Sequence, residues 1–173
     1  GAMTDLAKRP RLVVLATTYP RWRDDHEPGF VHELARRLTG RFDVVAVVPH
    51  ANGASVRENL DGVDIVRYRY APSRWETLVQ DGGITTHLRR SPWKWLLVPG
   101  FCAMQWWSAK RVVRTGAVVH AHWIVLPGIV ARFLGHPYLV TSHGADLFAL
   151  RASWAMRIKR WALSGAGATT VVS

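Results

Sequence analysis

Short apolar runs alternate with segments of helical periodicity along the chain. Apolar, β-branched runs predict strands at residues 11–17, 42–49, 63–70, 117–123, 137–142 and 168–173. Apolar residues at helical spacing predict helices over residues 30–38, 93–116, 126–135 and 151–167. We expect the third strand to be more exposed than the others, because its residues alternate. Residues 71–92 show weak periodicity, and we expect an irregular excursion with a helical turn there.

The remaining strand-forming runs are continuously apolar, which is typical of strands that are buried on both faces. Such strands belong to parallel sheets that helices cover. The pattern therefore predicts an α/β protein: a Rossmann-like three-layer α/β/α domain with a mostly parallel sheet of about six strands. Residues 1–3 are interpreted as a cloning scar, which leaves residues 4–173 as one domain. The apolar run at its end suggests a fragment of a longer protein.

Charge and cysteine content narrow the function classes. The chain has 23 Lys and Arg against 12 Asp and Glu, a formal net charge of +11, which predicts an anionic partner. Its single cysteine excludes an internal disulfide framework and a cysteine-rich zinc site, and suits a reducing cytoplasm. No signal peptide or apolar run of membrane-spanning length is visible in the sequence.

Polar residues follow three of the predicted strands, at the edge of the sheet where ligands bind in such folds. In the first of these segments, Gly29 precedes the helix at 30–38, where free backbone N–H groups and the helix dipole favour a phosphate. The alternative is that this glycine only starts the helix. The GxGxxG dinucleotide fingerprint is absent, so we do not expect a tightly bound NAD.

The second polar segment contains His120 and His122, which point to the same side of a strand. We expect one to pack in the core and the other to line the cleft. The alternative is a metal-dependent hydrolase, in which His143 and Asp146 complete a metal site with this pair.

The third polar segment is the strand exit at residues 141–146. His143 could donate a hydrogen bond to a phosphate or a sugar hydroxyl, and its ordinary pKa also permits proton transfer. Gly144 permits a close approach to the backbone. The alternative is a histidine that is hydrogen-bonded locally, with Asp146 capping the following helix.

Four motifs, in this order and spacing, carry a resemblance to a known family: VLATTYPRWRDDHEPGFVHELARRL, VVHAHWIVLPGIVAR, PYLVTSHGADLF and AGATTVVS. The chain resembles the N-terminal half of the retaining GT-B glycosyltransferases of family 4, the group 1 glycosyltransferases. The resemblance implies a hexosyltransferase-like enzyme whose N-terminal lobe binds the acceptor. It also implies a second lobe that holds the nucleotide-sugar and carries a Glu-x7-Glu motif. No glutamate pair at that spacing occurs here, so we expect the fragment alone to be inactive.

The resemblance also assigns roles to individual residues. It implies that His143 is the catalytic residue and that no cofactor or metal is needed besides the nucleotide-sugar co-substrate. It places Gly29, Phe30 and Gly144 at the donor's phosphate and sugar, although many relatives have Gly-Gly where this chain has Gly29-Phe30. The residues expected to bind a glycan or lipid-linked acceptor are Arg21, Arg23, His26, His122, Trp123 and Asp146.

Tryptophans and basic residues recur in the two longest predicted helices. Family members often act on lipid-linked acceptors at the inner face of the cell membrane, so the resemblance implies a cytoplasmic protein that is peripheral to that membrane. We predict a membrane-surface patch on an anionic bilayer that comprises Trp93, Lys94, Trp95, Trp106, Trp107, Lys110, Arg111 and Arg114. The alternative for Trp106 and Trp107 is core packing. A further alternative function is a basic module that binds nucleic acid or a membrane surface. Because no RNA- or DNA-binding motif is recognisable, we expect no nucleic-acid partner.

Overall fold

A seven-stranded sheet runs through the protein. The structure, a computed structural model, describes residues 9–17, 19–20, 30–51, 53–78, 83–122, 124–143 and 168–172. The strands are β1 (Arg11–Leu15), β2 (Asp43–Pro49), β3 (Arg57–Leu60), β4 (Val63–Tyr68), β5 (Val118–His122), β6 (Tyr138–His143) and β7 (Ala168–Val172). All six predicted strands are present, with bounds within two residues of those expected.

The sheet order is β3-β4-β2-β1-β5-β6-β7. Every neighbouring pair is parallel except the antiparallel pair β3 and β4. The α/β class and the mostly parallel sheet are therefore confirmed. The order of the parallel strands is compatible with a Rossmann-like fold, because the chain builds outward from β1 in one direction and then from β5 in the other.

The sequence analysis predicted β4 but missed β3. β3 joins β4 through Asp61 and Gly62, whose φ angles of 52° and 86° are those of a tight hairpin turn. Asp-Gly between two extended segments is the local signal that could have identified this hairpin. β4 is more exposed than β1, β2 or β5, as its alternation predicted: Asp64 is exposed and Val66 half-buried, whereas Ile65 is 1% exposed.

The described helical segments are α2 (Phe30–Leu38), α3 (Gly83–Arg90), α4 (Val98–Val112), α5 (Ile129–Phe133), the 3-10 helices η1 (Ser73–Trp75) and η2 (Pro92–Leu97), and the π-helical turn η3 (Ile124–Gly128). α2 has the predicted bounds. The helix predicted from residue 93 divides into η2 and α4, and it ends early because Val113 is extended. The eight residues of α3 correct the prediction of only a helical turn within 71–92. The sequence of α3 has only weak periodicity, so the helix was not predicted. In the structure it packs against η2, which stabilises it.

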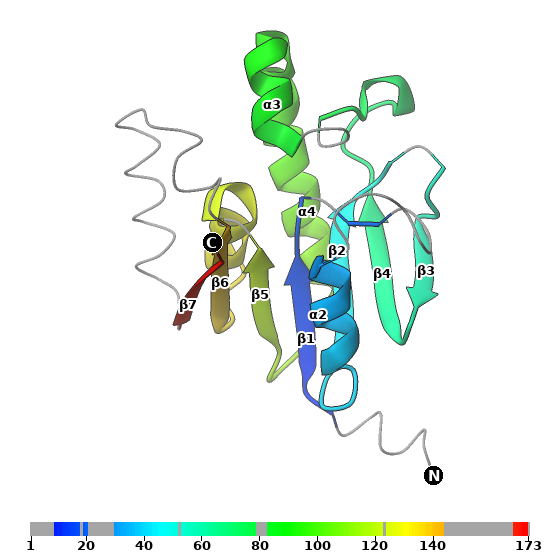
Figure 1. Cartoon of the computed structure of the whole chain (residues 1–173), viewed down its shortest axis with the longest axis vertical. Coiled ribbons are helices and arrows are strands. Elements are labelled where there is room, and N and C mark those ends of the chain that lie inside the picture. The colour runs from blue at the N-terminus through cyan, green and yellow to red at the C-terminus, as the bar shows by residue number, and fades with distance from the viewer. Residues whose placement is uncertain are drawn as a thin grey trace.

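Successive buried side chains of a strand pack on opposite faces of the sheet, so the core has two parts. Leu12 and Val14 of β1 pack on the face that contacts α2, whose Val31 is fully buried. Val13 and Leu15 pack on the opposite face, together with side chains of α4 and α5. Figure 1 shows α2 in front of the sheet and α4 behind it. No helix among the described residues is long and apolar enough to cross a membrane.

Candidate functional site at the carboxyl edge of the sheet

The neighbouring strands β1 and β5 mark the point where the direction of strand addition reverses. In open parallel sheets a ligand crevice forms outside the carboxyl ends of two such strands. The segments that leave β1 and β5 therefore meet at this edge, and β6 ends next to β5. These are the three polar strand exits that the sequence analysis selected.

The two histidines of β5 lie together on one face of the sheet. Their ring centroids are 4.2 Å apart, so the prediction that they share a side is confirmed. His120 Nε2 lies 2.7 Å from Thr141 Oγ1 on β6. Both imidazoles are buried, with His122 only 2% exposed. The acceptor role of His122 stays a prediction.

A metal site at these histidines would need further ligands. Within the described ranges, no group of three or more His, Cys, Asp or Glu side chains could hold a metal ion. His143 ends β6, two residues beyond the partner of His122 in the strand register. The backbones of His122 and His143 therefore reach the same edge.

Most of the other predicted site residues lie outside the described ranges. They are Arg21, Arg23, His26, Gly29, Trp123, Gly144 and Asp146. Phe30 is the first residue of α2, so the helix N-terminus that we expected to face a phosphate follows Gly29 directly.

The chain turns sharply where it leaves β5. η3 follows this strand after one residue, and within it Leu126 has a φ of 68°. A leucine rarely adopts this left-handed conformation, which costs about 1–2 kcal/mol. Strained residues and short π-helical segments often lie at ligand-binding sites. This turn is therefore a second feature at the β5 exit that is typical of ligand-binding sites.

A buried hydrogen-bond chain joins the exit of β1 to the first turn of α2. His32 Nε2 lies 3.0 Å from the Asp61 carboxylate, which can only accept, so Nε2 carries the proton. The other ring nitrogen, Nδ1, then accepts from the Tyr19 hydroxyl at 2.5 Å. Burial raises the pKa of Tyr19, which keeps its hydroxyl protonated as the donor.

Arg67 of β4 holds Pro20, the residue that follows Tyr19. Its side chain is 1% exposed and donates to the carbonyl oxygens of Pro20 and Ser55 at 2.9 and 2.8 Å. The same guanidinium forms an ion pair with Glu58 at 2.5 Å. Together with the Tyr19–His32 bond, this arginine fixes Tyr19-Pro20 and α2, the residues on either side of segment 21–29.

A second buried polar pair lies beyond the end of β2. His50 Nε2 donates to the carbonyl oxygen of Ala54 at 3.2 Å, and Nδ1 lies 3.0 Å from Glu76 Oε1. The other Glu76 oxygen accepts from the backbone N–H of Tyr70. The pair thereby holds η1 against the same edge of the sheet.

Sequence reasoning missed both networks. Three of their contacts join residues 26, 29 and 47 positions apart along the chain, and none of these residues has a distinctive neighbour in the sequence. A charged residue inside a predicted strand, as at Arg67, was the one available signal.

The predicted membrane-surface patch divides into exposed and packed side chains. Trp93, Trp95 and Trp107 are exposed. Trp106 is half-buried, and its Nε1 donates to the carbonyl oxygen of Phe133, so it turns toward α5. Core packing therefore describes Trp106 in part and does not describe Trp107.

The basic residues of this patch also differ among themselves. Lys110 and Arg111 are exposed near the end of α4. Arg114 is bound to Asp43 at 3.0 Å, and Lys94 contacts His87 at 3.2 Å. Among the described residues, Lys110 and Arg111 are therefore the patch cations that form no ion pair or hydrogen bond through their side chains.

Comparison with known proteins adds no relative: no family model matches the chain, and no curated protein matches it.

Proposed function

We propose that the chain is the N-terminal, acceptor-binding lobe of a retaining glycosyltransferase of GT-B architecture that resembles family 4. It would act in moving a sugar from a nucleotide-sugar to a glycan or a lipid-linked acceptor. The observation that carries this proposal is the strand order, which brings the exits of β1, β5 and β6 to one edge of a parallel sheet. In this proposal the sheet and its helices form a three-layer Rossmann-like lobe.

The chemistry that this edge must supply is stabilisation of a departing diphosphate. Negative charge develops on the leaving phosphate, and preorganised N–H donors stabilise it. The first turn of α2 supplies free backbone N–H groups and the positive end of the helix dipole, with Gly29 immediately before it. His143 would steady the donor sugar and the leaving group from the end of β6.

The buried networks give this arrangement rigidity. Tyr19 and Arg67 fix the chain before segment 21–29, and His32 fixes α2 after it. A site whose flanking residues are held in place before binding loses less conformational entropy when a ligand binds. The His50–Glu76 pair supports η1 beyond the end of β2.

The nucleotide-sugar lobe and its paired glutamates would come from residues beyond the 173 of this chain. The protein would work in the cytoplasm, at the inner face of the membrane. Sequencing the gene beyond residue 173 gives an independent test, because a second Rossmann-like unit with Glu-x7-Glu is expected there.

A nuclear magnetic resonance titration with inorganic pyrophosphate and with UDP-glucose tests the donor edge directly. We expect shifts in amides at the exits of β1 and β5 and in the first turn of α2. Gly29→Pro removes one N–H donor and should weaken pyrophosphate binding by about tenfold. Gly40→Ala is the matched control beyond the other end of α2, because an added Cβ meets nothing within 4 Å there. Equal affinities for the two variants, or shifts confined to another face, would contradict the proposal.

A further inference from the structure

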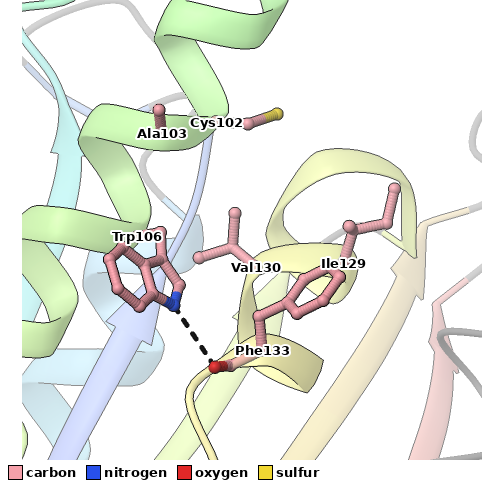
Figure 2. A pocket seen from close by; sticks show the side chains of 6 residues that line it. All are labelled: Cys102, Ala103, Trp106, Ile129, Val130 and Phe133. Atoms are coloured by element: carbon pink, nitrogen blue, oxygen red, sulfur yellow. Dashed lines mark hydrogen bonds between the residues drawn. The ribbon is translucent and has the colours of Figure 1, made fainter.

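An apolar groove lies between α4 and α5, on the face of the sheet opposite α2. Its cavity volume is about 290 Å³, near the lower end of the roughly 300–1,000 Å³ typical of small-molecule sites. Its lining residues are Cys102, Ala103, Trp106, Ile129, Val130 and Phe133. Figure 2 shows these side chains, three from each helix, around the space between the two helices.

The lining offers no polar group for a ligand to satisfy. The indole N–H of Trp106 already donates to the Phe133 carbonyl at 3.2 Å (Figure 2). Burial raises the pKa of Cys102 to about 11, so this thiol is neutral at physiological pH. A lining of this kind gives water no hydrogen-bond partner, and it favours contact with apolar molecules. The part of a ligand that enters the groove must therefore be hydrocarbon.

The groove has a cationic end. Lys110 follows Trp106 by one helical turn and lies on the same side of α4. Arg111 follows the exposed Trp107 by one turn. In the part of the chain that the structure describes, neither cation has an ion-pair partner, whereas Arg114 pairs with Asp43. Lys110 and Arg111 lie six and seven residues after Met104, which is about 10 Å along α4. One anion at that point of the helix would contact both cations.

Exposed apolar side chains occur in the groove lining and elsewhere on α4 and η2. Phe133 is 62% exposed and Trp107 55%, and Leu96 of η2 is 82% exposed. Aromatic and aliphatic side chains beside unpaired cations are typical of surfaces that lie in the headgroup region of a bilayer.

We propose that this groove binds one acyl chain of an anionic membrane lipid, whose headgroup lies against Lys110 and Arg111. The groove-lining residues of α4 contact the acyl chain, and Lys110 and Arg111 contact the phosphate of the headgroup. The site lies on α4 and α5, on the face of the sheet opposite α2, so it stands or falls separately from the proposed glycosyl transfer.

The first test uses a fluorescent polyene fatty acid, below its micelle concentration, as a soluble single-chain probe. We expect saturable binding of one probe per protein. Ala103→Trp fills the groove from an exposed position of α4, and should weaken binding at least about tenfold. Met104→Trp adds the same ring one residue further on, outside the lining, and should keep the affinity within about twofold.

The cationic end and the bilayer source are tested separately. Replacing both Lys110 and Arg111 by Gln should weaken probe binding about tenfold in low salt, and less in high salt. Sedimentation with phosphatidylglycerol and phosphatidylcholine vesicles should show binding to the anionic vesicles that Ala103→Trp reduces and Met104→Trp does not.

Three outcomes would overturn the inference. They are absence of probe binding, equal affinities of the two tryptophan variants, and anionic-vesicle binding that Ala103→Trp leaves unchanged. The last outcome would indicate a groove that takes a free fatty acid without a bilayer. None of these results bears on the pyrophosphate titration, so failure of the lipid site and failure of the donor edge are distinguishable.

Discussion

Replacing Arg67 by methionine tests how segment 21–29 is held. Methionine is also long and unbranched, so it keeps much of the packing of the arginine stem and removes the guanidinium. The Pro20 carbonyl and the Ser55 carbonyl then lose a charged donor. Glu58 loses its partner as well, but its side chain is 23% exposed and water can replace the arginine there.

The expected loss follows from these contacts. A hydrogen bond from a charged donor contributes about 1.5–3 kcal/mol, so two carbonyl bonds at the lower value give about 3 kcal/mol. We add little for Glu58, because a partly solvated ion pair contributes at most about 1 kcal/mol. For a chain of this length, a loss of about 3 kcal/mol lowers Tm by roughly 9 °C.

Urea unfolding followed by circular dichroism measures this change. Arg57→Met on β3 is the matched control, because Arg57 is exposed and its loss should stay within about 0.5 kcal/mol. Arg67→Met should also weaken pyrophosphate binding, since Pro20 would no longer be fixed. A destabilisation below about 1 kcal/mol, or one equal to that of Arg57→Met, would refute the anchoring role.

Three further predictions concern pH and backbone conformation. At pH 8, alkylation of Cys102 by iodoacetamide should be about a hundredfold slower than alkylation of an ordinary thiol, because burial raises its pKa from 9.0 to about 11; a rate like that of the urea-unfolded chain would contradict this. Burial also raises the pKa of Tyr70 from 10.0 to about 12. The unfolded state therefore releases this proton first, and stability should fall as pH rises from about 10 to about 12. Tyr70→Phe should lessen the fall in Tm over that pH window, and an unchanged fall would contradict the prediction. Gly62→Ala should destabilise the hairpin by about 1–2 kcal/mol in urea unfolding, because φ is 86° there; Gly40→Ala is the control, and equal effects would contradict the strain.

Elements with a strong local pattern were predicted well. The bounds of α2 were correct because Val31 and Ala35, one turn apart, form its buried face and Gly40 follows it. The continuous apolar runs located β1, β2 and the later parallel strands, because a strand that is buried on both faces shows this in its own residues.

Elements that depend on their neighbours were predicted poorly or not at all. β3 was missed because its four residues include no buried side chain, and it forms a strand as the antiparallel partner of β4. α3 has only a weak pattern of its own and is stabilised by packing against η2. For the candidate site, the sequence identified the strand exits but not the groups that hold them, such as Tyr19 and Arg67.

The sequence by itself determined the fold class, most strands, α2 and the choice of three polar strand exits. Apolar periodicity is a property of adjacent residues, so it is visible before folding. Only the tertiary structure decided that β1 and β5 are neighbours, that His32 bonds to both Tyr19 and Asp61, and that an apolar groove opens between α4 and α5. Each of these depends on contacts between residues far apart in the chain, and such contacts exist only once the whole chain has folded around its core.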